Sequence, residues 1–542
     1  MRFCVCLCVL LISACTKNPA TNKLDFMVLD EVEEYQLGRD SKSTIAKSKF
    51  YKDLKAQEYY RNLAEQVYAV GERSDKNFSF YFLDDDVVNA AATPGYMFLN
   101  RGLLPYIQDE AALMGVLAHE AGHINARHSA KKVSFDAAKD WAWGGVFALN
   151  RKIEQDVFNM SYSRSLENEA DLLAVKYLNK LEVPAENMVQ NYQAFAKLDE
   201  LNLKMHNLNE NLKSKKQSNH SILDSHPIPE NRVSQIEEKT KHHYLIEPYK
   251  QEEFYNKIDG LEYGYSGKGK QEFELIESKD SILIKKNSLA GVYGFKNTAY
   301  MKKQGLKVNL PKLYQARIKT SDPLAYNYQK DVLVEIFEQS DDRYFTSLDL
   351  IAKMLGLKAH AKQSFMQDIR KGKDTGYIKM LTAEYADKLG ESEELFSLKK
   401  SSNWFYDLFD INTQYFYFYI NQLNSLDDFG KHNSYENNFR VIILSSNSKK
   451  SFDEVMLDDI LFIKDNLKQL SSKEKAKIKP LAIKTIKAKG DETIEQLSQD
   501  NIPYINFNQE WFKLINGLYD DYNADIKNGQ WLKLIPNPNK DI

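Results

Sequence analysis

The residues His119-Glu120-Ala121-Gly122-His123 form an H-E-x-x-H pattern that could bind one zinc ion. On a helix, positions i and i+4 lie on one face about one turn apart, so His119 and His123 could supply two imidazole ligands. The intervening Glu120 could then act as a general base on a water at the metal. The alternative interpretation is a chance match on an amphipathic helix, because so short a pattern occurs in unrelated proteins.

The sequence before this pattern predicts the helix that it needs. Gln108-Asp109-Glu110 places acidic residues at the expected N-terminus, and residues 111–118 are good helix formers or apolar residues. The apolar side of this helix is broad. We therefore expect the helix to be buried inside a domain.

A second predicted helix offers a third ligand. A catalytic zinc site usually has three protein ligands and an open fourth position. Residues 163–175 read as a helix, on which Glu167 and Asp171 are four positions apart and share a face, whereas Glu169 points elsewhere. The alternative interpretation is a solvated acidic face without a ligand role. The residues alone leave both interpretations open.

The combined motifs over residues 25–245 resemble those of metallopeptidase family forty-eight. Its members include the CaaX prenyl proteases, the HtpX heat-shock proteases, the mitochondrial Oma proteases and the periplasmic BepA-type proteases. Two of the matching motifs are H-E-x-x-H at 119–123 and E-N-E-A-D at 167–171. The other segments that match the family's patterns are N-A-A-A-T-P-G at 89–95, R-G-L-L at 101–104, N-A-R-H at 125–128, S-H-P at 225–227 and N-R-V at 231–233.

The resemblance implies a fold of the α+β class, in which a mainly helical, gluzincin-type zinc protease domain carries a small edge sheet. It also implies that His119 and His123 are zinc ligands and that Glu167 is the third ligand. By the same resemblance, Glu120 is the general base, and Asp171 is the carboxylate that orients a ligand imidazole. One zinc ion per chain is the expected cofactor.

His226 occupies the position of a loop histidine that, in BepA-like members, can close onto the zinc and block the water site. The alternative interpretation is a turn histidine before Pro227. Residues 203–224 form a polar run that leads to His226, and we interpret this run either as an active-site lid or as a plain solvated loop. Arg232 would anchor the loop by pairing with an active-site carboxylate, or would form a purely structural salt bridge.

The segment 87–100 reads as a strand that could hold an extended substrate at a sheet edge, with Tyr96, Met97 and Phe98 passing the zinc. The alternative interpretation is a core strand. The other histidines of the chain, His128 among them, show no second metal motif, and we interpret them as ordinary histidines.

The N-terminus predicts export and lipidation. Residues 3–14 form an apolar run after Arg2 that is too short to span a bilayer and has the layout of a secretory signal. Its end resembles a bacterial lipobox, so we expect lipidation of Cys15. Because all four cysteines lie within residues 4–15, we expect no disulfide in the mature protein. Thr16, in place of an aspartate, favours an outer-membrane lipoprotein that faces the periplasm.

Composition and the breaks in the sequence pattern along the chain predict five segments. They are a lipoprotein signal peptide at 1–14, a tether at 15–30, a zinc protease domain at 31–245, a mixed α+β domain at 246–480 and a small LysM-like module at 481–537. Strands are expected at 281–286, 306–310, 333–338, 415–420 and 439–445, and helices at 454–467 and after a capping box at 471–474. The net charge of −3 argues against nucleic-acid binding.

The C-terminal segment resembles a LysM module, a small fold that binds N-acetylglucosamine glycans such as peptidoglycan. The similarity lies in residues 490–497 and 514–534, although Glu492 is an extra residue and the middle is lengthened. A cell-wall anchor and a purely structural module are both open interpretations.

Together these observations predict a lipid-anchored periplasmic zinc endopeptidase, whose partners would be misfolded or stalled envelope proteins and the membrane, with peptidoglycan as a further candidate. The competing hypothesis is a non-catalytic binding or chaperone-like lipoprotein localised by its C-terminal module.

Overall fold

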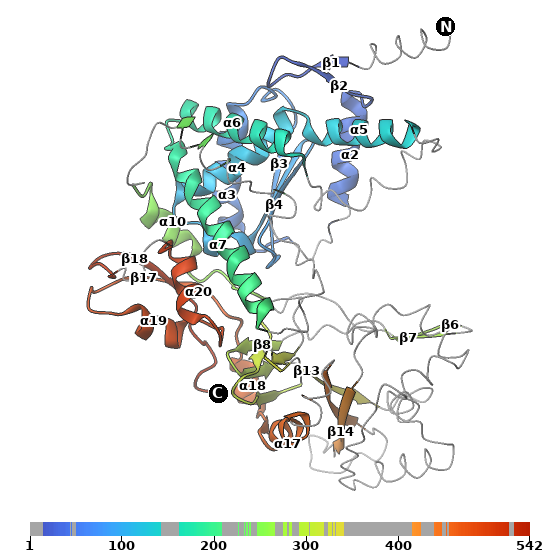
Figure 1. Cartoon of the computed structure of the whole chain (residues 1–542), viewed down its shortest axis with the longest axis vertical. Helices are drawn as coiled ribbons and strands as arrows, with labels where there is room; N and C mark the ends of the chain where they lie inside the picture. Colours follow the sequence, from blue (N-terminus) through green and yellow to red (C-terminus); the bar gives the residue numbers. More distant parts are fainter. Residues whose placement is uncertain are drawn as a thin grey trace.

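Figure 1 shows the computed structural model of the chain. The structure describes residues 15–43, 45, 50–142, 162–208, 226, 232, 235–236, 238–239, 247–265, 275–278, 281–284, 292–302, 304–318, 324–327, 329–330, 332–340, 415–423, 438–446, 451, 455–519 and 525–542. The predicted signal peptide and most of the predicted lid, from residue 209 to 224, lie outside these described residues.

The N-terminal half is mainly helical. Its helices are α2 (Glu31–Ser43), α3 (Leu54–Ala69), α4 (Glu110–Asn125), α5 (His128–Ala142), α6 (Arg164–Lys180) and α7 (Met188–Asn207). The prediction of a buried helix is confirmed, because every residue of α4 is buried. The predicted acidic N-terminus is also confirmed: the Asp109 side chain caps α4 by accepting a hydrogen bond from the backbone N–H of Ala112 at 2.7 Å.

A small sheet lies against α4 and has the order β3-β5-β4. The strands are β3 (Ser79–Leu83), β4 (Ala90–Thr93) and β5 (Tyr96–Asn100); β5 runs parallel to β3 and antiparallel to β4. The prediction that residues 96–98 form a substrate-binding edge is therefore wrong. β5 is the central strand and pairs on both sides, which is the core-strand alternative, and the edge near α4 is β4.

For residues 15–30 the structure differs from the predicted tether. β1 (Cys15–Lys17) and β2 (Leu24–Phe26) pair as an antiparallel hairpin that lies beside α5. The amide of Asn18, between the two strands, is buried and donates to the Ala126 carbonyl at 2.9 Å. The backbone N–H of Val28 donates to Ser134 Oγ at 2.9 Å. The chain after Cys15 is thus fixed on the helical domain.

A second core lies between two antiparallel sheets. One sheet has the order β16-β10-β9-β8 and the other β11-β12-β13-β15-β14. Their strands are β8 (Val292–Phe295), β9 (Thr298–Met301), β10 (Leu306–Asn309), β11 (Gln315–Ala316), β12 (Ala325–Asn327), β13 (Val332–Ser340), β14 (Tyr415–Leu423), β15 (Asn438–Ser446) and β16 (Leu467–Gln469). A separate hairpin joins β6 (Leu275–Ser278) and β7 (Ser281–Ile284).

The elements predicted within this region are confirmed. Each of the five expected strands falls on β7, β10, β13, β14 or β15. The expected helices are α17 (Leu457–Asp465) and α18 (Ser472–Lys477). α18 begins at the predicted capping box, in which Ser471 and Glu474 exchange side-chain and backbone hydrogen bonds.

The last segment has the order β17 (Lys484–Lys487), α19 (Ile494–Asn501), α20 (Asn508–Ile515) and β18 (Trp531–Leu534), with β17 and β18 antiparallel. It packs beside α7 and α10 (Gln251–Ile258) and shares one hydrophobic core with the helical domain (Figure 1). Lys533 is fully buried and donates to the carbonyls of Pro105 and Ile107 at 2.8 and 2.6 Å. This C-terminal module therefore contacts the helical domain at the residues just before α4.

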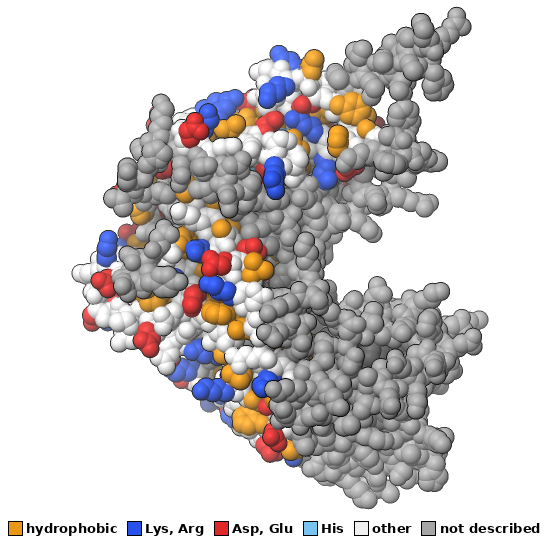
Figure 2. Space-filling model, viewed as in Figure 1, with side chains coloured by type: hydrophobic (Ala, Val, Ile, Leu, Met, Phe, Trp, Pro, Cys, Tyr) orange, Lys and Arg blue, Asp and Glu red, His pale blue; other side chains and the backbone are white. Residues whose placement is uncertain are grey.

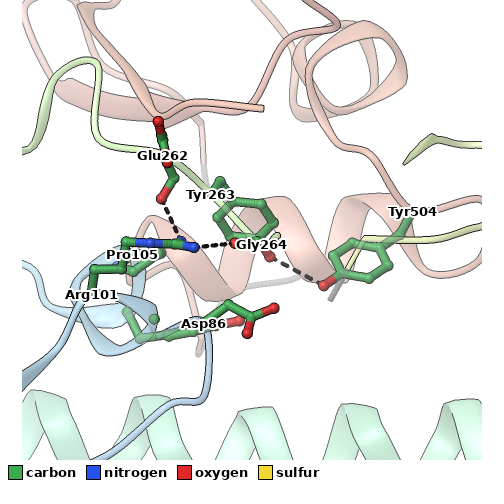
Figure 3. Close-up of a pocket in the computed structure, with 9 residues that line it drawn as sticks. Asp86, Arg101, Pro105, Glu262, Tyr263, Gly264 and Tyr504 are labelled. Atoms are coloured by element: carbon green, nitrogen blue, oxygen red, sulfur yellow. Dashed lines mark hydrogen bonds between the residues drawn. The ribbon is translucent and has the colours of Figure 1, made fainter. Parts of the chain in front are cut away.

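A second seam joins the helical domain to the chain that follows α10. Arg101 begins the 3-10 helix η2 (Arg101–Tyr106) and is almost fully buried. It pairs with Asp84 at 2.6 Å and donates to the carbonyls of Glu262 and Gly264 at 2.8 and 2.5 Å. Figure 3 shows Arg101, Glu262 and Gly264 around a small pocket that Tyr504 of the C-terminal module also lines. Arg101 of the R-G-L-L motif thus holds the chain after α10 against the helical domain.

The described surface in Figure 2 shows Lys and Arg side chains interspersed with Asp and Glu side chains, in keeping with the small net charge. Within the described residues, no helix combines the length and the apolar character that crossing a bilayer requires.

Candidate metal centre

Two helices position the candidate ligands. α4 carries His119 and His123 one turn apart, and α6 packs directly against α4 with Glu167 in its first turn. Gly122 permits this close approach, because a Cβ atom at that position would lie 2.9 Å from the carbonyl oxygen of Ala170. The predicted motif helix and the predicted acidic helix therefore meet at the face that carries the metal-binding residues.

The ligand atoms converge on one point. His119 Nε2 lies 2.9 Å from His123 Nε2 and 3.4 Å from Glu167 Oε2, and His123 Nε2 lies 3.6 Å from Glu167 Oε1. Two ligand atoms that are each about 2.1 Å from a tetrahedral zinc ion lie about 3.4 Å apart. Two imidazoles and one carboxylate at these separations fit zinc, both in chemistry and in spacing.

His226 completes a buried group of four. Its Nδ1 lies 3.3 Å from His119 Nε2 and 3.2 Å from both Glu167 oxygens. The candidate ligand atoms of His119, His123, Glu167 and His226 all lie within 4.8 Å of one another. The structure thus brings the loop histidine next to the three candidate ligands of α4 and α6.

A carboxylate supports the first histidine. Asp171 Oδ1 accepts from His119 Nδ1 at 2.8 Å, which leaves His119 Nε2 directed at the metal position. Arg232 binds Asp171 through two hydrogen bonds of 2.7 and 2.8 Å and lies 3.0 Å from Glu167. Tyr192 donates to Asp171 at 2.6 Å. Arg232 therefore pairs with two carboxylates of the candidate site, and its role there stays a prediction.

Burial and the interactions among these buried groups shift their pKa values. Burial raises the pKa of Glu167, but the neighbouring His226 and His119 outweigh burial and hold it well below its usual range. Burial lowers the pKa of His119, but hydrogen bonds to Asp171 and Glu167 outweigh it and raise the pKa to about 10. Burial lowers the pKa of His123, and the nearby His119 adds to the effect. Glu167 is thus an anion, as a metal ligand must be.

Glu120 faces the same space from α4. It is 2 % exposed, and its Oε2 atom has no hydrogen-bond partner in the described part of the chain. Its Oε1 atom lies 3.6 Å from His226 Nε2. Burial raises the pKa of Glu120, which makes its carboxylate a better proton acceptor near neutral pH. An unpartnered buried carboxylate oxygen beside three ligands is the arrangement that a general base on water requires.

A small pocket of about 40 Å³ lies next to His119 and Glu120. Its walls are mainly apolar and come from α4 and α7, through Val116, Met188 and Phe195. Gly115 also lines it. The pocket is thus a small apolar hollow directly beside the candidate base.

The second ligand histidine has partners that the sequence interpretation missed. His123 Nδ1 lies 2.8 Å from His128 Nδ1, and the Tyr162 ring stacks on the His123 ring with centroids 4.2 Å apart. His128 is brought there by the turn after α4, where Arg127 has a φ of 57° and α5 begins at His128. Its place in the N-A-R-H motif was the available signal, whereas nothing in the sequence marks Tyr162.

The comparisons with known proteins concern this half of the chain. Residues 54–240 match the sequence model of peptidase family M48. A relative named putative beta-barrel assembly-enhancing protease from Vibrio cholerae is 28 % identical over 202 residues, which are 34 % of this chain and 39 % of that protein. The mitochondrial metalloendopeptidase OMA1 of Schizosaccharomyces pombe is 29 % identical over 130 residues, 22 % of this chain and 39 % of that protein.

The human mitochondrial metalloendopeptidase OMA1 is 28 % identical over 177 residues, 28 % of this chain and 34 % of that protein. The chain therefore spans about two fifths or less of the length of the curated relatives that it matches.

Proposed function

We propose that this chain, whose residues 54–240 match the sequence model of peptidase family M48, is a zinc-dependent endopeptidase. The observation that carries the proposal is the convergence of His119, His123 and Glu167 beside the unpartnered Oε2 atom of Glu120. The residues supply both halves of a metallopeptidase site, namely a nitrogen and oxygen donor set for zinc and a buried carboxylate base.

Zinc, when bound, would lower the pKa of a coordinated water and polarise the carbonyl of the scissile peptide bond. Glu120 would accept a proton from the attacking water and deliver it to the nitrogen of the leaving amine. Asp171 would hold His119 with its Nε2 atom toward the ligand position, and Arg232 would balance the negative charge of Asp171 and Glu167.

We also propose that His226 restrains the site. Its ring fills the space between Glu167 and Glu120, where water and the scissile bond would have to enter. Departure of His226 would open that space without disturbing the other three ligands. On this proposal, the arrangement with His226 beside Glu167 and Glu120 is the closed state.

Envelope proteins that are misfolded or stalled are the substrate class that we propose. The support is the name of the Vibrio cholerae relative, a putative beta-barrel assembly-enhancing protease, together with the lipobox-like sequence before Cys15. On this proposal Cys15 carries the lipid, the domain works on the periplasmic side of the outer membrane, and the C-terminal module contacts peptidoglycan. Sedimentation with insoluble peptidoglycan tests the last point, and a lack of retention would remove it.

Cleavage of casein and of a membrane protein by the purified full chain tests the enzymatic function. We expect cleavage that a chelator abolishes and added zinc restores, and that Glu120→Gln lowers by about 10²–10⁴-fold, the usual contribution of a positioned acid–base group. Glu58→Gln, an identical change at an exposed position on α3, should retain full activity. If the zinc-loaded wild-type protein and Glu120→Gln are equally inert on every substrate, the non-catalytic binding function is favoured instead.

A further inference from the structure

The two histidines of α4 have different supports on the side away from the metal position. His119 Nδ1 faces a carboxylate, Asp171. His123 Nδ1 instead faces the ring nitrogen Nδ1 of another histidine, His128, at 2.8 Å. His128 is fully buried, so water does not compete for this contact.

The positions of the hydrogen atoms in this pair follow from the ring nitrogen through which His123 would bind zinc. When His123 binds zinc through Nε2, its Nδ1 must carry a hydrogen atom. That N–H can donate to His128 only if His128 Nδ1 is an unprotonated acceptor. The hydrogen atom of His128 must then be on Nε2, and His128 Nε2 does face an acceptor, Glu169 Oε1, at 3.5 Å.

The contacts continue beyond His128 to the N-terminal hairpin. Glu169 Oε1 accepts from Lys131 Nζ at 3.2 Å, and Lys131 Nζ lies 2.8 Å from Asp25 Oδ2 on β2. The same Asp25 oxygen accepts from the buried Asn18 at 2.6 Å. The His128 side chain is fully buried, and the others are only partly exposed, with 20 % at Glu169, 13 % at Lys131 and 20 % at Asp25.

We propose that His128 is a positioning residue for the zinc ligand His123, and that Glu169, Lys131 and Asp25 extend this support to the hairpin that begins at Cys15. On this proposal, each contact of the path has a defined hydrogen-bond donor and acceptor. Lys131 donates to both Asp25 and Glu169, Glu169 fixes the hydrogen atom of His128 on Nε2, and His128 accepts from His123. This inference rests on the proposed zinc site and adds to it a connection with the N-terminal segment.

Two amide substitutions at His128 separate positioning from simple packing. Asn in place of His puts its Oδ1 atom near the former Nδ1 position and keeps an acceptor for His123. Gln puts its polar atoms near the former Nε2 position and leaves His123 without one. We expect His128→Gln to weaken zinc binding about 10–100-fold, as removal of such outer partners usually does, and His128→Asn to restore most of it.

Zinc affinity of the full chain is measured by competition with a chromophoric chelator. The visible absorption of the cobalt-substituted protein reports the geometry around the metal, which a mere loss of packing would leave unchanged. We expect the cobalt bands of His128→Gln to shift and those of His128→Asn to match the wild type. Equal zinc affinity and equal cobalt spectra for Gln, Asn and wild type would overturn the proposal, and so would equal losses in both variants with an unchanged spectrum.

Glu169→Leu gives a second test at a partly exposed position, in case the His128 variants do not fold. Loss of the Glu169 acceptor should weaken zinc binding several-fold, and Asp25→Asn should have a smaller effect in the same direction. Glu58→Leu on α3 is the control for the loss of an acidic side chain. Unchanged zinc affinity in Glu169→Leu overturns the proposed path. Failure of the wild-type protein to bind zinc at all would instead overturn the proposed enzymatic function.

Discussion

The core around α4 buries many charged side chains, whereas the described part of the core between the two sheets of residues 292–463 buries one, Arg317. The first core holds Glu34, Arg73, Arg101, Asp109, Glu110, Glu120, Arg127, Glu167, Asp171 and Arg232. Burial of a charge costs free energy unless the charge is paired. In the α4 core the buried charged groups include those that can bind a metal or hold its ligands. The sheet core does not need buried charges for such a site.

This difference implies that substitutions in the α4 core can change activity, stability or both. Substitutions in the sheet core should change stability alone.

The largest effect is expected at the third ligand. Glu167→Gln removes the anionic donor, so zinc content should fall and peptidase activity should drop by more than about 100-fold, the upper end for loss of an outer partner of a metal ligand. Metal analysis and casein cleavage measure both. Full zinc content with full activity would exclude Glu167 as a ligand.

Arg232→Met should produce the largest loss of stability. It leaves Asp171 and Glu167 without their shared cation, and breaking a buried pair costs about 3–5 kcal/mol. Urea unfolding of the zinc-free proteins measures the change. Arg164→Met, at an exposed position on α6, is the matched control and should leave the free energy of unfolding unchanged. An equally small effect of both substitutions would contradict the comparison of the two cores.

Leu306→Ala tests the other half of the comparison. Leu306 is fully buried in the sheet core, so its truncation should cost about 2–5 kcal/mol of unfolding free energy. Zinc content and kcat/KM at a temperature where the variant is folded should match the wild type. A fall in kcat/KM without a loss of folded protein would show that the sheet core acts on the metal centre.

His226→Ala should have a smaller and opposite effect on activity. Removal of the ring opens the space between Glu167 and Glu120, so basal cleavage should rise several-fold while zinc content is retained. Initial rates on casein, with the zinc content of each preparation, measure this. Unchanged or lower turnover would count against restraint by His226.

The smallest effect is expected at Glu72, at the surface of the α4 core. Burial raises the pKa of Glu72, but hydrogen bonds from Lys176 and Tyr177 outweigh it and lower the pKa below its ordinary value. The resulting stabilisation is present above the pKa of the unfolded chain, about 4.3, and is lost as pH falls through the folded value. Glu72→Gln should therefore be less stable than the wild type at pH 7, with the gap closing below about pH 4.5. Thermal melts across this range measure the gap, and a constant gap would contradict the linkage.

The sequence was sufficient for the parts of the site that depend on local spacing. Four-residue spacing on a helix placed His119 with His123 and Glu167 with Asp171, and alternation placed the strands of the sheet core. It was not sufficient where position depends on pairing between distant segments. Whether β5 is an edge or a central strand is decided by β3, and the role of His128 is decided by the left-handed turn at Arg127.

Residues 15–30 and the C-terminal module show the same limit. The tether was predicted from its place after Cys15 and the module from its resemblance to LysM, yet Asn18 and Lys533 are both fully buried. Each is buried because it meets backbone carbonyls of the helical domain, at Ala126 and at Pro105 and Ile107. Backbone carbonyls carry no sequence signal, so partners of this kind are found only in the folded chain.

The contact of Lys533 with the carbonyls before α4 also sets an order of events during biosynthesis. The ribosome produces α4 more than 400 residues before Lys533. Until that lysine arrives, the carbonyls of Pro105 and Ile107 lack their ammonium partner, and the shared core lacks β18. The core around α4 is therefore completed only after Lys533 and β18 have been made, more than 400 residues after α4 itself.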